Sequence, residues 1–174
     1  IIRHDCEVTI ENENIRAIDF DDVPDLVGIA VTVDVLPRAI EIASIYRQKG
    51  VKVIAGGIHI TTASSSVPKD AFDSLCIGFA ENTWPQIIED MKHNRLQSEY
   101  VSKPLISGND IVAPAYDMID KTDYLWYNVV STSRSCPHKC DFCYNSSSTH
   151  QYINRNIDDV LADIKQLGTK HIMF

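Results

Sequence analysis

The chain has 174 residues, 44% of them hydrophobic and 23% charged, with a formal net charge of -8 at pH 7. That length and apolar content suffice for one large domain or two small ones, each with a hydrophobic core. The acidic balance, without any basic run, argues against a nucleic-acid groove, which needs clustered Lys and Arg to neutralise phosphates. We therefore expect no nucleic-acid partner and a small-molecule or peptide substrate.

Nothing in the sequence indicates membrane insertion or export. No apolar run approaches the length of a membrane span, and residues 1–5 lack the basic-then-apolar order of a signal peptide. The five cysteines are odd in number and three are clustered, which suits a reducing cytoplasm better than a disulfide scaffold. Cys6 and Cys76 lie in apolar segments and are expected to be buried as small hydrophobic residues. These features predict a cytoplasmic protein.

Short apolar runs in the first half of the chain predict strands. Residues 6–10 alternate between apolar and polar, which indicates a half-buried strand. Residues 25–32 are nearly continuously apolar and rich in β-branched side chains, as in a parallel strand covered on both faces. Further buried strands are expected at residues 52–55 and 74–78.

Two amphipathic helices are predicted between and after these strands. The first has Pro37 in its opening turn and Gly50 as its stop, and the second has Pro85 in its opening turn and Asn82 or Thr83 as its cap. The alternation of strands and helices predicts an α/β fold with a doubly wound, Rossmann-like parallel sheet, because parallel strands need crossovers. The apolar faces of the two helices are Leu36, Ala39, Ile40 and Ala43, and Trp84, Ile87, Ile88 and Met91.

The pattern changes at the middle of the chain and divides it into three parts. Residues 1–97 are predicted to form the first domain. Residues 98–124 contain Pro104, Pro114 and scattered polar residues that break any long period, which indicates a linker. Residues 125–174 are predicted to begin a second domain.

The second domain is predicted to start with a βαβ unit. Residues 126–132 and 170–174 are expected to be its strands. The helix between them has Asn156 as its cap and Gly168 as its stop, with the apolar stripe Ile157, Val160, Leu161 and Ile164.

Between the first strand and the helix of this unit lies a C-x3-C-x2-C array. Its cysteines, Cys136, Cys140 and Cys143, lie so close in sequence that their thiolates can converge on one small inorganic core. A structural zinc site needs four ligands, whereas an iron-sulfur cubane held by three cysteines leaves one iron open. A zinc site completed by His138 or His150, or three unliganded thiols, are the alternatives.

This array, with the aromatic Phe142 directly before the last cysteine, resembles the cluster-binding loop of the radical S-adenosylmethionine (radical SAM) superfamily. The resemblance implies that Cys136, Cys140 and Cys143 hold a 4Fe-4S cluster and that Phe142 lies beside the adenine of S-adenosylmethionine. In that family S-adenosylmethionine chelates the open iron, and an electron donor such as flavodoxin or ferredoxin drives the cleavage of this cofactor to a 5'-deoxyadenosyl radical. The resemblance also implies that the βαβ unit is the first of a partial TIM barrel.

The first half of the chain, over about residues 5–97, resembles the cobalamin-binding domain that precedes the radical SAM domain in many members of that superfamily. The likeness lies in residues 25–29, 50–59 and 78–85. It implies that the first strand of such a domain lies before Ile1, and that a diglycine and nearby hydroxyls line the slot for the nucleotide tail of cobalamin. These residues are Gly56, Gly57, Thr32, Thr61 and Thr62.

Physical arguments accompany this second resemblance. Glycine lets the backbone approach a flat ligand closely, and the loops after Val31 and Ala55 should be neighbours at one edge of a parallel sheet. The chain lacks the D-x-H-x-x-G segment that supplies a histidine to cobalt in many cobalamin domains, and Phe79 stands where the family has Glu. His59 is expected to bond within its loop rather than to ligate cobalt. The simpler alternative is a doubly wound domain whose two glycines only turn the chain.

The sequence thus predicts a fragment of a radical SAM enzyme with an N-terminal cobalamin-binding-like domain. Methyl transfer is the favoured reaction of the parent protein, with ring rearrangement or other carbon chemistry as alternatives. The chain by itself is expected to be inactive, because later strands would complete the substrate pocket. The alternative is non-catalytic: an iron-sulfur electron carrier, or a corrinoid-binding module with a structural metal site.

Overall fold

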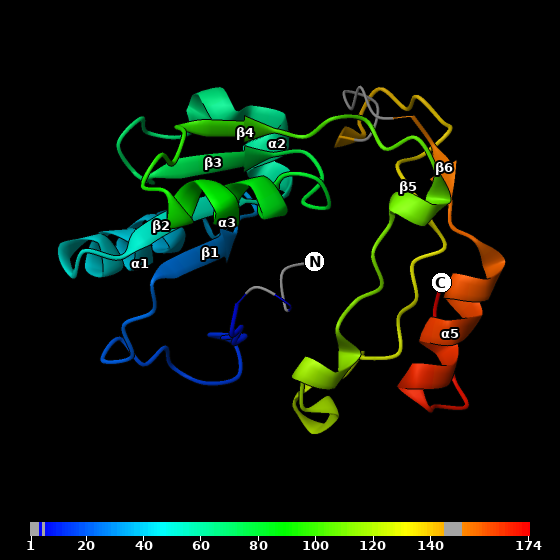
Figure 1. Ribbon diagram of the computed structural model, residues 1–174. Helices are drawn as coiled ribbons and strands as arrows, with labels where there is room; N and C mark the ends of the chain where they lie inside the picture. The colour runs from blue at the N-terminus through cyan, green and yellow to red at the C-terminus, as the bar shows by residue number, and fades with distance from the viewer. Residues whose placement is uncertain (1–3, 5, 145–150) are drawn as a thin grey trace. The chain divides into compact units, whose positions relative to one another are not determined.

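The computed structural model describes His4 and residues 6–144 and 151–174 (Figure 1). The described chain divides into two compact units. Unit 1 contains His4 and Asp19–Lys103, and unit 2 combines residues 6–18 with Pro104–Phe174.

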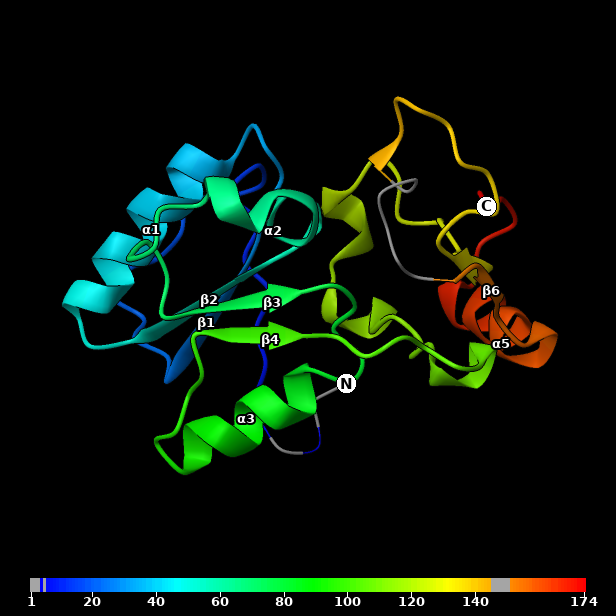
Figure 2. The ribbon, with the colours of Figure 1, turned by 90° about the horizontal axis from the view of Figure 1, so that it is seen from above.

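Unit 1 is built on a four-stranded parallel sheet in the order β1-β2-β3-β4. Figure 2 shows α1 and α2 on one face of this sheet and α3 on the other. The predicted α/β fold with a parallel sheet is therefore confirmed for this unit. The strands are β1 (Leu26–Ala30), β2 (Lys52–Gly56), β3 (Ser74–Ile77) and β4 (Glu99–Val101), and the helices are α1 (Leu36–Gln48), α2 (Ile58–Ala63) and α3 (Trp84–Lys92).

Alternation along the strands divides the core of unit 1 between the two faces of the sheet. On the α3 face, Gly28 is essential to the packing, because a Cβ there would lie 2.8 Å from the indole ring of Trp84. Val53 and Ala55 alternate with Ile54 along β2 and are fully buried, and α1 contacts this strand. The α3-side cluster consists of Ile54, Cys76, Ile87 and Tyr100, with Leu26, Trp84 and Leu96 packed against it.

The helix boundaries of unit 1 follow the local signals except at one cap. Pro37 and Pro85 lie in the first turns of α1 and α3, and Gly50 follows α1 with a positive φ of 83°. Thr83 precedes α3, but its side chain makes no capping bond. Its hydroxyl instead lies 3.1 Å from the buried Sγ of Cys76 in β3. The Thr83 side chain therefore bonds to the sheet and does not form the predicted cap of α3.

In the described part of unit 2, the longest regular element is the helix α5 (Ile157–Leu167). Two short antiparallel strands, β5 (Ser133–Arg134) and β6 (Ile153–Asn154), pair with each other. Three single-turn 3-10 helices precede them, and the core contains Tyr116, Val130 and Leu167, with Tyr127, Val160, Ile164 and Ile172 packed against it.

Three strand predictions differ from the structure. Residues 6–10 form no strand, and Ile10 is exposed, because no neighbouring strand pairs with this segment in the described chain. The strands expected at 126–132 and 170–174 are reduced to a single parallel bridge between Val129 and Met173. Residues 99–101, inside the stretch predicted as a linker, form β4. Within the described residues, none of the helices is both long and apolar enough to cross a membrane.

Candidate functional site

The carboxyl ends of β1 and β2 lie side by side and form one edge of the sheet in unit 1. The backbone N–H of Val31 donates a 2.8 Å hydrogen bond to the carbonyl of Gly56, and the N–H of His59 donates one of 3.1 Å to the carbonyl of Val31. The loops after these two strands are therefore neighbours, as predicted. We call this place the glycine edge; it comprises residues 31–34, 56–62 and 78–79.

The two glycines at this edge are not equivalent. Gly57 has φ 102° and ψ -171°, a conformation that is essentially restricted to glycine. A Cβ there would lie 2.9 Å from both N and O of Val31. At Gly56 a Cβ would lie 3.6 Å from Cys76, an ordinary contact distance. Gly57 is thus required by the close approach of two backbones, whether or not a ligand binds.

The hydroxyls predicted to face a cofactor are bonded within the chain. Thr61 Oγ1 donates to the carbonyl of Gly57 at 2.8 Å and accepts from the N–H of Gly78 at 3.0 Å, so it joins the loops after β2 and β3. Thr62 Oγ1 donates to the carbonyl of Ile58 at 2.8 Å. Both hydroxyl protons are used in holding the glycine edge, which leaves these oxygens available to a ligand only as acceptors.

Thr32 lies at the same edge and is exposed. Its hydroxyl donates to a carboxylate oxygen of Asp34, and this bond holds the pKa of the Asp34 carboxyl below its ordinary value. The edge is therefore polar and negatively charged on the β1 side at neutral pH.

His59 is bonded within its loop, as expected. Its Nε2 lies 3.1 Å from Oγ of Ser66, and that same hydroxyl donates to the carbonyl of Ala63 at 2.7 Å. Because the single hydroxyl proton is directed at the carbonyl, Nε2 of the imidazole acts as the donor to Ser66. The ring of His59, which lies on α2, is thus oriented by Ser66 of the short 3-10 helix Ser64–Ser66.

The loop after β3 is held by residues that sequence reasoning missed. Ser102 Oγ accepts from the N–H of Phe79 at 3.0 Å, and the Asn82 side chain bonds both the carbonyl and the N–H of Lys103. These contacts join the loop to the end of β4. The sequence did not predict β4, because a strand of three residues is too short to show an apolar period.

The cysteine loop lies in unit 2, between β5 and β6. Cys136 and Cys143 are half-buried, Cys140 is exposed, and none of the three is in a disulfide. Cys143 donates its N–H to the carbonyl of Cys140 at 3.0 Å, and Ser135 turns the chain with a φ of 62°. Asn145 and His150 lie outside the described residues, so the predicted alternative of a zinc ligand at His150 cannot be placed.

The chemistry of the donor set fits an iron-sulfur cluster, although the thiols are not assembled around a centre. Among the described residues, no group of three or more His, Cys, Asp or Glu side chains is arranged to hold a metal ion. Three cysteines on one loop are nevertheless the ligand type that iron-sulfur clusters use. Phe142 is 94% exposed, so its ring is accessible to another flat group.

The segments on either side of the cysteine loop, residues 131–134 and 153–155, form its stem. A buried ion pair that the sequence did not reveal holds this stem in place. Arg155 directly follows β6, and its guanidinium donates to Asp163 of α5 at 2.6 Å and to the carbonyl of Ser131 at 2.9 Å. The two charged side chains are 1% and 2% exposed. Arg155 and Asp163 lie on either side of the helix cap Asn156, and no sequence motif indicates that such a pair will meet.

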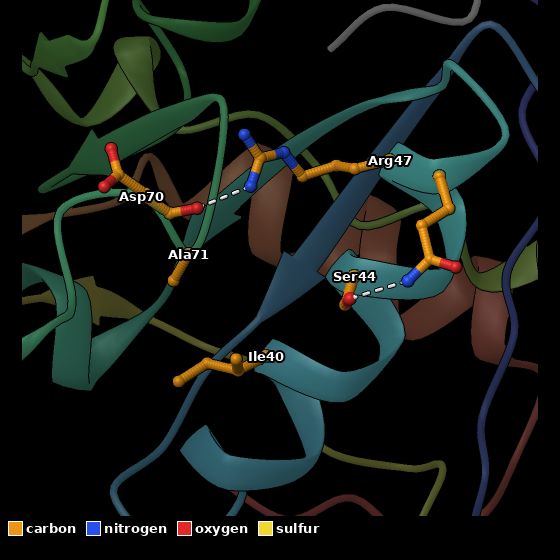
Figure 3. Close-up of a pocket in the computed structure, with 6 residues that line it drawn as sticks. Ile40, Ser44, Arg47, Asp70 and Ala71 are labelled. Carbon is orange, nitrogen blue, oxygen red and sulfur yellow. Dashed lines mark hydrogen bonds between the residues drawn. The ribbon is translucent and has the colours of Figure 1, made fainter.

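A separate surface groove lies between α1 and the loop before β3 (Figure 3). Arg47 crosses it to the carbonyl of Asp70, and Gln48 donates to the hydroxyl of Ser44 at 3.1 Å. The groove contains none of the predicted site residues and lies toward the amino end of β3, away from the glycine edge. Its lining residues are Ile40, Ser44, Arg47, Gln48, Asp70 and Ala71.

Fold and site together define a parallel α/β domain, consistent with a Rossmann-like fold, followed by a unit that carries a three-cysteine loop. The chain is similar to bacteriochlorophyllide d C-8(2)-methyltransferase of Chlorobaculum tepidum, with 30% identity over 153 residues, covering 84% of this chain and 34% of the relative. It is also similar to an uncharacterized methyltransferase of Pyrococcus horikoshii, with 27% identity over 213 residues, covering all of this chain and 46% of the relative.

The chain therefore spans between a third and a half of the length of these two curated relatives. No protein-family model matches it, and no solved structure matches it significantly. The similarity connects the chain to proteins named as methyltransferases.

Proposed function

We propose that this chain is part of a radical SAM methyltransferase with an N-terminal cobalamin-binding-like domain. The observation that carries the proposal is the set of three cysteines outside any disulfide, Cys136, Cys140 and Cys143, on one loop of a chain similar to two methyltransferases. On this proposal, residues 1–97, extended by β4, form the cobalamin-binding-like domain, the rest of residues 98–124 connects it, and residues 125–174 begin the catalytic domain as the first βαβ unit of a partial TIM barrel.

The residues of the cysteine loop would have distinct roles. The three thiolates would hold a 4Fe-4S cluster, and Phe142, with its exposed ring, would pack on the adenine of S-adenosylmethionine. When bound, the cluster would supply the electron that cleaves S-adenosylmethionine, and cobalamin would carry the methyl group to be transferred. Ser135, with its positive φ, redirects the chain from β5 into the loop that presents these ligands.

The whole protein would act on a small-molecule or peptide substrate in the cytoplasm, with flavodoxin or ferredoxin as its electron donor. The acidic composition and the lack of any basic run support a substrate other than nucleic acid. The bacteriochlorophyllide in the name of one relative belongs to that relative, of which the match covers only 34%.

Anaerobic reconstitution tests the cluster. The full 174-residue chain should take up about four irons and four sulfides. Cys140→Ala should abolish this uptake, because Cys140 is one of only three thiols in the loop. Cys6→Ala is the matched control and should retain the full iron content, since Cys6 lies outside the loop. A colourless protein holding one tightly bound zinc would contradict the proposal.

Addition of S-adenosylmethionine separates the enzyme from an electron carrier. A cluster with an open iron should change its electron paramagnetic resonance spectrum when S-adenosylmethionine is added, because the cofactor then coordinates that iron. A fully ligated cluster of the electron-carrier type would show no change. An unchanged spectrum in a fully reconstituted sample would favour the non-catalytic alternative.

Cobalamin binding at the glycine edge needs a variant that leaves the fold intact. The strain at Gly57 means that a side chain there would disturb the edge itself, so loss of binding in Gly57→Val would not identify a ligand site. Thr32 is exposed, and Thr32→Trp should block a ligand at this edge without disturbing the core. Lys69→Trp, exposed on the loop before β3, is the matched control at the opposite end of the strands.

Titration with hydroxocobalamin, followed by its visible absorption, measures this effect. We expect the parent chain and Lys69→Trp to bind with equal affinity and Thr32→Trp to bind at least about tenfold more weakly, which corresponds to about 1.4 kcal/mol. Equal binding by all three proteins would place the cobalamin elsewhere. Absence of binding by the folded parent would leave the glycine edge with a structural role.

A further inference from the structure

The buried pair of Arg155 and Asp163 ties together the three elements that surround the cysteine loop. The backbone N–H of Arg155 donates to the carbonyl of Thr132 at 2.9 Å, and its Nη1 donates to the carbonyl of Ser131 at 2.9 Å. Both acceptors lie immediately before β5. The same Nη1 donates to Asp163 Oδ2 of α5 at 2.6 Å, so one guanidinium connects the segment entering the loop, the segment leaving it and the helix that follows.

Neighbouring contacts reinforce this stem. Ser131 Oγ donates to the carbonyl of Ser133 at 2.9 Å and accepts from the guanidinium of Arg134 at 3.3 Å. On the other side, Gly108 packs against β6 so closely that a Cβ there would lie 2.0 Å from the carbonyl oxygen of Asn154 and 2.9 Å from Cα of Arg155. The backbone on both sides of the cysteine loop is therefore held at fixed positions.

A gain in folding stability does not by itself explain the buried pair of Arg155 and Asp163. The guanidinium keeps two buried donors, Nε and Nη2, without a hydrogen-bond partner in the described chain. A buried ion pair must recover the cost of removing both charges from water, and apolar residues of similar volume often replace it without loss of stability. Donors left unpaired add to that cost. The pair instead provides a defined position for the chain on both sides of the loop.

We propose that Arg155, oriented by Asp163, is a positioning residue for the cysteine loop: it sets the separation of β5 and β6 from which the three thiols converge on their cluster. The inference rests on the proposed function of the loop as a cluster site. In the described chain, the hydrogen bonds of Arg155 go to Ser131, Thr132 and Asp163 and to none of the three cysteines. Its influence passes through Ser131, Thr132 and the β5–β6 pairing.

The test is the double variant Arg155→Met/Asp163→Leu, which replaces the pair by apolar side chains of similar size and leaves no buried charge unpaired. We expect its thermal unfolding midpoint to equal or exceed that of the parent. After anaerobic reconstitution, its cluster should lose iron to a ferrous chelator about tenfold to a hundredfold faster, the range seen when residues that orient metal ligands are removed.

Two further variants separate positioning from stability. Arg155→Lys keeps the charge beside Asp163 but cannot span to the Ser131 carbonyl as a guanidinium does, so it should also lose iron faster. Lys121→Met is the matched control: it removes a contact to the end of α5 without touching the stem. It should lower the unfolding midpoint and leave the rate of iron loss unchanged.

Titration with Co²⁺ separates failure of this inference from failure of the proposed function. Thiolate-to-cobalt absorption reports how well the three thiols converge on a single metal ion, even if no iron-sulfur cluster forms. A parent chain that forms no cluster would overturn the proposed function, and Co²⁺ affinity would then decide the positioning role. Equal Co²⁺ affinity and equal chelator rates in the parent, the double variant and Arg155→Lys would overturn the inference.

Discussion

Asp90 is the residue on which the end of α3 and the short strand β4 depend. Its buried carboxylate accepts hydrogen bonds from Tyr100 Oη at 2.9 Å, Arg95 Nε at 2.7 Å and Gln97 Nε2 at 3.1 Å. The bond from Tyr100 is the largest cause of a lowered pKa at Asp90, and those from Arg95 and Gln97 act in the same direction against the effect of burial.

The lowered pKa at Asp90 predicts a pH-dependent stability. A carboxyl whose pKa is lower in the folded state stabilises the fold above its unfolded pKa, and this contribution is lost as the pH falls from the ordinary value of 3.8 toward the folded value. Asp90→Asn should therefore have a lower thermal unfolding midpoint than the parent at pH 7. Below about pH 4 the midpoint of the variant should fall less steeply than that of the parent, because the variant has no carboxylate to protonate at this position. Circular dichroism melts from pH 3 to 7 measure both. A parallel shift of the whole curve would contradict this role.

The two glycines at the end of β2 predict opposite responses to the same substitution. Gly57→Ala should destabilise unit 1 by about 1–3 kcal/mol, because alanine cannot adopt the backbone angles of Gly57 without strain. Gly56→Ala should be tolerated, since its Cβ makes only ordinary contacts. Urea unfolding followed by circular dichroism would measure the difference, and equal stability of the two variants would show that the Gly57 backbone is not constrained.

At the scale of elements, α5 shows how a helix can follow its sequence signals at both ends. Asn156 accepts from the N–H of Asp158 at 3.0 Å, and Gly168 closes the helix in the left-handed conformation with a φ of 63°. Both predicted boundary residues are confirmed. Lys121, more than forty residues earlier in the chain, donates from Nζ to the carbonyl of Leu167 at 2.8 Å and lies over the ring of Tyr127.

The contact of Lys121 with the last turn of α5 predicts a moderate loss of stability in Lys121→Met. The variant keeps the aliphatic stem but removes a charged donor from a helix carboxyl end, which should cost about 0.5–2 kcal/mol. Urea titration followed by circular dichroism would measure this loss. Lys170→Met, at an exposed lysine just beyond the helix, is the control. Equal stabilities of the two variants would show that the Lys121 contact does not stabilise the end of α5.

At the scale of the whole molecule, the cysteine loop is the candidate site for generating a radical, and few regular elements accompany it in the described part of unit 2. In the described part of unit 2, the helix α5 is accompanied only by the short β5–β6 pair, single-turn 3-10 helices and an isolated parallel bridge between Val129 and Met173. Such a unit has too few strands to surround S-adenosylmethionine and exclude water from a radical reaction. Catalysis would require further βα units of the kind proposed for the whole protein.

We therefore predict that the 174-residue chain turns over no methyl acceptor, even with a complete cluster. The assay is formation of 5'-deoxyadenosine from S-adenosylmethionine with a chemical reductant, and we expect only slow uncoupled cleavage. The Cys140→Ala variant provides the background rate. Rapid cleavage by a chain verified by mass spectrometry would show that the described units already contain a complete active site.

The sequence by itself determined the elements that depend on local patterns. The periodicity of apolar residues located β1 to β3, α1, α3 and α5, and proline and glycine marked their ends, because these signals lie within a few residues of one another. The spacing of Cys136, Cys140 and Cys143 likewise predicted a loop, which lies between β5 and β6, and its iron-sulfur chemistry stays a prediction. It also followed from parallel topology alone that the loops after Val31 and Ala55 would be neighbours.

Only the tertiary structure decided the features that depend on partners far apart in the chain. Tyr100 belongs to a strand because its hydroxyl and ring fit beside Asp90 and the α3-side core, which no local period encodes. The pairing of Arg155 with Asp163 is set by how α5 packs on the stem of the cysteine loop. Gly57 needs to be glycine because the backbone of Val31 passes close beside it, a contact between segments joined only through the sheet.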